Sequence, residues 1–324
     1  MDNQAVEPVA SAHSVARSPR KRSLKKQLLP NLIANGGIFA LNILLGMWYT
    51  PYLIRYLGVA AYGLIPLANS LAPYLSLISL SLNGAAGRFL TIDLEREELD
   101  SANCTFNTVL FGNVGLIGLM LPVVIGVTWF VPRWFDVPAG QEVYAQWLFA
   151  ATLGSYLLTL LQSSFSVSTW ARNRFDLRNA VVAIHHLLRV GIVVVVFSLT
   201  RPLLWHVGLG IVVAALFGIA GDMWLWRRLT PQLQIRPSSF DRSRVRQLFG
   251  MGGWMVVNQV GTLLWRSDLI VANILLGAKV AGEYGSILLF STMLSQLADT
   301  ASAVLTPTIL ALSLIHISEP TRPY

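Results

Sequence analysis

The sequence predicts an all-α fold, a bundle of transmembrane helices that crosses the bilayer many times, on two observations. Hydrophobic residues make up 54% of the 324 residues and charged residues only 12%, whereas a soluble domain carries about 25% charged residues. The charges are also bunched, because none occurs in residues 27–54, 56–87, 101–132 or 143–171. Each stretch exceeds the roughly 20 residues that span a bilayer core, so no water-surrounded core explains them.

Helices, rather than a barrel, are the expected form of these stretches. Backbone polar groups in lipid must be satisfied internally, which leaves α-helices or a closed β-barrel. A barrel needs short segments of alternating hydrophobicity, whereas these stretches are long and apolar on every face. We therefore predict eight spans, at residues 31–54, 62–86, 105–131, 143–168, 180–199, 203–226, 248–275 and 284–310.

Residues 1–26 are polar and basic, and we predict that they form a cytoplasmic tail. The apolar run that follows is too long for the core of a signal peptide, so we expect an uncleaved first span. The net charge of +8 would also suit a nucleic-acid-binding protein. Because the basic residues lie beside hydrophobic spans, we expect the lipid bilayer and no nucleic acid as partner. Cys104 is the only cysteine, which excludes an intrachain disulfide.

The distribution of Lys and Arg predicts a cytoplasmic N-terminus. With this orientation, the tail and the loops after spans 2, 4 and 6 face the cytoplasm and hold most of the basic residues. The segments on the other side hold only Arg55, Arg133, Arg201 and Lys279. Cytoplasmic loops collect Lys and Arg, so the bias favours this topology.

A linker and an internal repeat predict two bundles. We expect a first six-helix bundle at residues 27–228, a cytoplasmic linker at 229–246, and the first two helices of a second bundle at 247–311. An even number of spans separates the two copies, so both would insert in the same orientation, a pattern typical of transporters. Chance remains the alternative, because Leu-Gly and Tyr-Gly pairs are common. The matching segments are Tyr52-Leu53-Ile54, Leu57-Gly58 and Tyr62-Gly63 in the first copy, and Asp268-Leu269-Ile270, Leu276-Gly277 and Tyr284-Gly285 in the second.

Residues 312–324 have an unusual character. The stretch from Leu312 to Arg322 resembles the conceptual translation of a sequencing adapter. On that interpretation the natural sequence stops near Ala311, and the full protein continues with roughly four to six further spans. We therefore assign no function to residues 312–324 and expect the second bundle to be truncated.

A resemblance to a known family rests on Arg55-Tyr-Leu-Gly58-Val-Ala-Ala-Tyr62-Gly63, which follows a first helix with Asn31, Asn35 and Asn42. This stretch resembles the start of the lipid-linked oligosaccharide flippases, which export O-antigen and teichoic acid precursors and belong to the multidrug/oligosaccharidyl-lipid/polysaccharide exporter superfamily. The resemblance covers roughly residues 28–310 and implies about twelve to fourteen helices in two bundles around a central cavity. The sequence departs from this pattern by lacking most of the second bundle.

The resemblance also implies a function and a location. It implies a monomer in the bacterial inner membrane that carries an undecaprenyl-pyrophosphate-linked glycan from the cytoplasmic to the outer leaflet. Other polysaccharide-assembly proteins are its expected partners, and no cofactor is implied.

Basic and amide side chains inside the spans are the candidate substrate-binding residues. Arg189 lies three and four residues after His186 and His185, a spacing that places all three on one helix side. A guanidinium can bind a pyrophosphate through two hydrogen bonds. Alternatively, Arg189 reaches the inner interface and contacts water, and the amides only join neighbouring helices. The candidates are Arg189, Arg266, His185, His186, Asn258, Asn42 and Arg55, and we expect no metal site.

Carboxylates inside the spans are candidates for ion coupling. Asp268, Asp299 and Asp222 could each bind the proton or sodium ion that a gradient-driven transporter needs. The alternative is a structural role, as partner of a basic residue such as Arg266. If span 7 ended by Trp265, Arg266 and Asp268 would lie at the interface instead.

From the resemblance we expect an exporter of lipid-linked oligosaccharide that works by alternating access, and not an enzyme. The sequence has no Gly-x-x-x-x-Gly-Lys phosphate loop, His-Glu-x-x-His or Gly-x-Ser-x-Gly motif. The first alternative is a proton- or sodium-coupled small-molecule antiporter of the same superfamily. The second is a polytopic glycosyltransferase or glycan polymerase, which the short outer loops disfavour.

Overall fold

The computed structural model describes residues 20–172, 174–265 and 267–318. Within these ranges it describes the side chains of residues 35–75, 79, 82–83, 86–172, 174–248, 259–261, 263–264 and 267–298. The elements in this part of the chain are all helical, in agreement with the predicted all-α fold. They are α1 (Arg20–Leu57), α2 (Val59–Glu95), α3 (Leu99–Trp134), α4 (Glu142–Ala171), α5 (Phe175–Leu199), α6 (Leu204–Leu229), the 3-10 helix η1 (Pro237–Ser239), α7 (Arg242–Trp265) and α8 (Asp268–Ser318).

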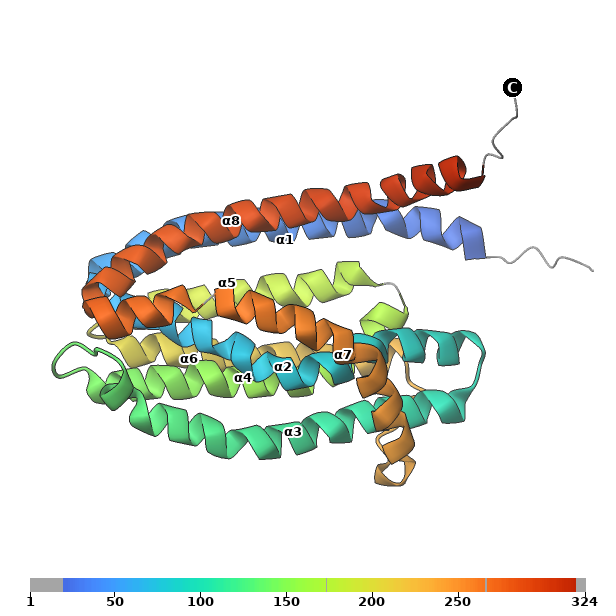
Figure 1. Ribbon diagram of the computed structural model, residues 1–324, viewed down its shortest axis with the longest axis horizontal. Coiled ribbons are helices and arrows are strands. Elements are labelled where there is room, and N and C mark those ends of the chain that lie inside the picture. The colour runs from blue at the N-terminus through green and yellow to red at the C-terminus, as the bar shows by residue number, and fades with distance from the viewer. Residues whose placement is uncertain (1–19, 173, 266, 319–324) are drawn as a thin grey trace, which may run out of the picture.

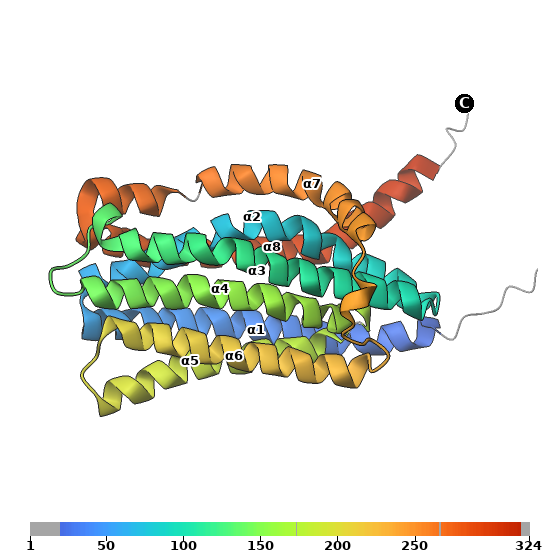
Figure 2. The same cartoon turned by 90° about the horizontal axis from the view of Figure 1, so that it is seen from below.

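The helices run lengthwise and connect at two ends of the molecule. α1 and the long part of α8 after its kink lie along one edge, and the other helices lie below them (Figure 1). Figure 2 shows that α5 and α7, which overlap in the first view, lie on opposite sides. The connections at Gly58, at residues 135–141 and at residues 200–203 gather at what we call the Gly58 end. The connections at residues 96–98 and 230–241 gather at the opposite end, which we call the linker end.

The helices have the length and composition of membrane spans. Six segments among the described residues are long and apolar enough to cross a bilayer. Many of their large apolar side chains point outward, including Leu119, Val123 and Trp129 on α3 and Leu199 on α5. Large apolar surface on the outside suits lipid rather than water as the solvent. The prediction of a polytopic, all-α membrane protein is therefore confirmed.

One predicted span is wrong in its extent. Residues 248–275 do not form one helix, because α7 ends at Trp265 and α8 begins at Asp268. The Ser267 hydroxyl donates to the carbonyl of Leu264 (2.8 Å), and the Asp268 carboxylate accepts from the amide of Leu269 (2.8 Å). Such local side-chain bonds compete with the helical ladder and favour helix ends. Hydropathy alone hides this break, because apolar residues continue on both sides.

The two copies of the sequence repeat share a backbone feature. Gly58 separates α1 from α2 with φ 80° and ψ 160°, and Gly277 kinks α8 with φ 87° and ψ 170°. Glycine adopts this region far more readily than other residues. In each copy the following tyrosine donates back to the preceding segment, Tyr62 to Thr50 and Tyr284 to Asp268. The similarity supports the repeat, whereas the division of the chain into two bundles stays a prediction.

The linker is held in place by amide side chains of α3. Asn103 bonds the carbonyl of Gln232 (3.3 Å) and the amide of Gln234 (2.8 Å). Asn107, one turn later, bonds the carbonyl of Gln234 (2.8 Å) and the amide of Arg236 (2.7 Å). Each side-chain amide thus pairs with extended backbone much as a neighbouring β-strand would. The segment between α6 and α7 is therefore anchored to the first helices.

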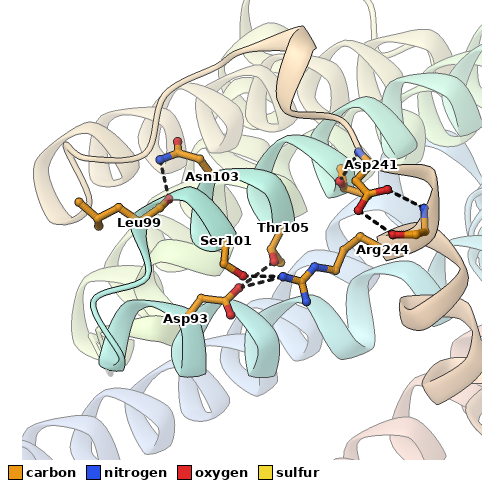
Figure 3. A network of polar contacts seen from close by, with 9 residues as sticks. Asp93, Leu99, Ser101, Asn103, Thr105, Asp241 and Arg244 are labelled. Carbon is orange, nitrogen blue, oxygen red and sulfur yellow. Dashed lines mark hydrogen bonds and ion pairs between the residues drawn. The ribbon is translucent and has the colours of Figure 1, made fainter.

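A polar network then fixes the start of α7. Asp93, at the end of α2, accepts from the Thr105 hydroxyl (2.9 Å) and lies 3.8 Å from the Arg244 guanidinium. Arg244 also donates to Ser101. Figure 3 shows that these side chains, from α2, α3 and α7, point toward one another. Asp241 precedes α7 and accepts from the amide and hydroxyl of Ser243, which lowers the pKa of the Asp241 carboxyl.

Candidate functional site

A cavity of about 880 Å³ lies among α1, α2, α5 and α8, and Gly261 of α7 also reaches it. Its wall therefore combines the first helices of the chain with the second copy of the repeat. Several hydroxyl and amide side chains face it beside aliphatic ones. The polar and aromatic lining residues are Asn42, Tyr49, Thr50, Tyr62, Asn69, Ser70, His186, Arg189, Asp268, Ser291, Thr292 and Ser295.

Arg189 is the notable residue of this wall. It lies in the interior of α5, and its Nε atom is fully buried without a hydrogen-bond partner among the described residues. The Tyr49 hydroxyl is buried and unpartnered too, and it lies within electrostatic reach of Arg189. A buried N–H of a cationic side chain that lacks an acceptor is costly inside a membrane span. The site therefore favours an anion that enters the cavity and accepts from the guanidinium.

Glycine packing positions Arg189. α6 approaches the backbone of α5 so closely that a Cβ on Gly210 would lie 2.9 Å from the carbonyl oxygen of Arg189. One turn earlier on α5, the Nδ1 atom of His185 lies 2.8 Å from the carbonyl oxygen of Ala214 on α6. These contacts fix the rotation of α5, so Arg189 and its neighbour His186 face the cavity.

The two histidines therefore differ. His186 lines the cavity as expected. His185 packs toward α6 and is not among the residues that line the cavity, so its role in substrate binding stays a prediction. The two histidines diverge because the helical turn of about 100° per residue sends adjacent side chains in different directions.

The remaining basic and amide candidates separate in the same way. Asn42 lines the cavity from α1. Arg55 is exposed near the end of α1 and is not among the residues that line the cavity. Arg266 and the side chain of Asn258 lie outside the described residues.

The acidic candidates occupy different environments. Asp268 lines the cavity, and its carboxylate accepts from Tyr284 and from the amide of Leu269. Asp222 is 2% exposed between α6 and α4. Its Oδ2 accepts from Gln162 (2.8 Å), and its Oδ1 has no partner among the described residues. Asp222 does not line the cavity, and the side chain of Asp299 lies outside the described residues.

Sequence reasoning missed several lining residues. Tyr49, Asn69, Ser70 and the α8 residues Ser291, Thr292 and Ser295 all face the cavity. On α8 a signal was present, because Ser291 and Ser295 are four residues apart and share one side of a helix. On α2 the prolines Pro66 and Pro73 flank the polar pair.

A second polar cluster has a structural role. Asn83 and Asn113 exchange hydrogen bonds between α2 and α3 (2.9 and 3.3 Å). Asn113 also donates to Ser164 (2.9 Å), and Ser163 donates to Asn83 (3.1 Å). Polar groups that satisfy one another in this way join neighbouring helices in lipid.

Comparisons with known proteins agree with the resemblance noted in the sequence. The family described as "Polysaccharide biosynthesis protein" matches residues 28–313. The chain is also 30% identical over 280 residues to the "Uncharacterized membrane protein EpsK" of Bacillus subtilis (strain 168). The alignment covers 86% of this chain and 55% of that protein, so the chain spans about half the length of the curated relative. No solved structure matches the chain significantly.

Proposed function

The chain belongs to the polysaccharide biosynthesis protein family, and from this premise we propose that it moves a lipid-linked oligosaccharide across the membrane by alternating access. The proposed cargo is an undecaprenyl-pyrophosphate-linked glycan, and the proposed direction is from the cytoplasmic to the outer leaflet. The protein acts as a monomeric transporter in the bacterial inner membrane, and other polysaccharide-assembly proteins supply and consume its cargo.

Arg189 at the cavity is the observation that carries this proposal. The pyrophosphate of a lipid carrier brings several negative charges into a low-dielectric space, where they need a cationic partner. The Nε of Arg189 is buried and free to donate. Amide and hydroxyl groups elsewhere on the cavity wall, from Asn42, Asn69 and Ser70, match the hydrogen-bonding groups of the first sugars.

The cavity is suited to an anionic cargo rather than to a cationic drug. The carboxylate of Asp268 is already engaged by Tyr284 and the amide of Leu269. Arg189 is thus the charge that stays available among the described lining residues. The antiporter alternative would need a free carboxylate facing the cavity.

Complementation tests the proposal. In cells that lack their own exporter for such a glycan, we expect the complete gene to restore surface polysaccharide and to deplete lipid-linked precursor on the cytoplasmic leaflet. The measurement is precursor accessibility on each face, with surface polysaccharide by immunoblot. If precursor still accumulates when the gene is expressed, and the cells extrude cationic dyes, the antiporter is favoured.

Reporter fusions test the proposed orientation. Fusions in the α4–α5 connection and in the linker at Ser238 should give cytoplasmic signals, because these segments carry clustered arginines. Fusions at Ala139 and at Arg201 should give signals from the opposite face. A fluorescent protein that folds only in the cytoplasm, paired with alkaline phosphatase, distinguishes the two. Active phosphatase at Ser238 would reverse the topology.

A further inference from the structure

At the Gly58 end, beside the cavity, α2 and α8 are in direct contact. A Cβ on Gly63 would lie 2.8 Å from the carbonyl oxygen of Ala278 and from the backbone of Gly282. A Cβ on Gly282 would overlap the carbonyl oxygen of Val59. The two helices therefore touch backbone to backbone, which small residues permit.

A clasp outside the helices reinforces this contact. Asp136 lies in the connection between α3 and α4, and its carboxylate accepts from the amide of Ala278 (2.7 Å), just after the kink at Gly277. The amide of Asp136 donates to Asn273 (3.0 Å), whose side chain donates back to the carbonyl of Asp136 (3.3 Å). Three hydrogen bonds thus tie the first helices to the second copy of the repeat.

The kink at Gly277 makes the hydrogen bond between Asp136 and Ala278 possible. Its left-handed backbone exposes the amide of Ala278, and a Cβ at Gly277 would lie 2.9 Å from the Asp136 carboxylate. A glycine there therefore lets the carboxylate reach the kink. Gly58, the counterpart in the first copy, has nothing within 4 Å of such a Cβ. The clasp is thus peculiar to the second copy.

The packing is much looser toward the linker end. From Phe290 to Ala298 every residue of α8 except Met293 is exposed, including the lining residues Ser291, Thr292 and Ser295. On α1, a Cβ at Gly36 or Gly37 would meet nothing within 4 Å. Among the described residues, α8 is therefore closely packed near Gly282 and largely exposed from Phe290 onward.

We propose that Asp136 is a positioning residue that latches the Gly58 end of the cavity closed through the kink of α8. This inference rests on the proposed alternating access and identifies one latch of that cycle. Opening at the Gly58 end requires α8 to leave α2, and the clasp must break first. Asn273 is fully buried, so half-broken states leave buried polar groups unpaired and are disfavoured. The latch therefore acts as a two-state element. Its hydrogen bonds join the connection at Asp136 to the amide of Ala278 and the side chain of Asn273, so they can break without unwinding a helix.

Cysteine accessibility tests the latch without any cargo. The full-length protein with Cys104→Ala and Ser70→Cys carries one thiol in the cavity wall, and Ser239→Cys in a separate variant marks the linker face. A membrane-impermeant maleimide is applied from each face of oriented membranes. We expect Asp136→Ala to raise the labelling rate of Ser70→Cys from the face opposite the linker by about tenfold, the effect of losing one charge-assisted hydrogen bond.

Two matched variants separate a latch from a general loss of structure. Asp136→Asn keeps an acceptor oxygen and should label within about twofold of the parent, because a neutral acceptor retains part of the bond. Glu142→Ala removes a carboxylate that bonds only the nearby amide of Gly140, and should label like the parent. Equal labelling of Asp136→Ala and the parent from that face would overturn the latch.

A crosslink provides an independent measurement should Asp136→Ala fail to reach the membrane. Oxidising Asp136→Cys and Ala278→Cys to a disulfide, which leaves the thiol of Ser70→Cys unmodified, should abolish maleimide labelling of Ser70→Cys from the face opposite the linker. Unchanged labelling after complete crosslinking would refute the latch. If the labelling series shows the latch but the protein without substitutions exports no glycan, the proposed function alone is refuted, because labelling needs no substrate.

Discussion

Replacing Arg189 with glutamine is expected to abolish export of the lipid-linked glycan while the amount of protein in the membrane stays unchanged. Glutamine keeps a polar side chain but removes the positive charge. The Arg189 Nε has no partner among the described residues, so its loss leaves no described acceptor unpaired. The loss of a desolvated charge pair with the cargo is worth roughly 3–5 kcal/mol, a hundredfold or more in cargo binding.

Arg189→Lys refines this prediction, because lysine keeps the charge but lacks the planar fork that binds phosphate through two bonds. We expect a level of export between that of the parent and that of Arg189→Gln. Surface polysaccharide and membrane-bound protein are both measured by immunoblot. Arg55→Gln is the matched control, since Arg55 is exposed outside the cavity, and it should export normally. Normal export by Arg189→Gln would remove Arg189 from the site.

Replacing Gly282 with alanine is expected to have the second large effect. The added methyl group would overlap the carbonyl oxygen of Val59, and a backbone atom cannot move aside as a flexible side chain can. Overpacking of this kind costs about 1–3 kcal/mol or more, and it acts only when α2 and α8 are in contact. We therefore expect lower thermal stability in detergent, loss of export, and a cavity that cannot close at the Gly58 end.

Gly154→Ala is the control for this substitution. Gly154 lies inside α4, and a Cβ there would meet nothing within 4 Å. Alanine should stabilise this helix by up to about 1 kcal/mol through its higher helix propensity, so export and stability should not fall. A Gly282→Ala protein with unchanged melting temperature and export would show that α2 and α8 do not need this close contact.

The sequence by itself determined that most of this chain lies in lipid, and hence that it is an all-α membrane protein. Transfer of each side chain into lipid contributes almost independently, so long uncharged runs predict membrane helices without knowledge of any contact. The same reasoning identified Arg189 as a candidate site residue, because a cation inside an apolar span is energetically costly unless it has a partner or a function. The repeated Leu-Gly and Tyr-Gly pairs likewise predicted an internal repeat, and Gly58 and Gly277 have nearly the same backbone angles.

Only the tertiary structure decided which neighbour each side chain meets. Helical periodicity placed His185 and His186 near Arg189, but the packing of α6 against α5 turned His185 away from the cavity. No local pattern links Asp136 to Ala278, more than a hundred residues later. The physical reason is that apolar helices in lipid gain little from one partner over another. Small features therefore decide their docking, such as a glycine at a crossing or a carboxylate beside a kink, and these act only between segments far apart in the chain.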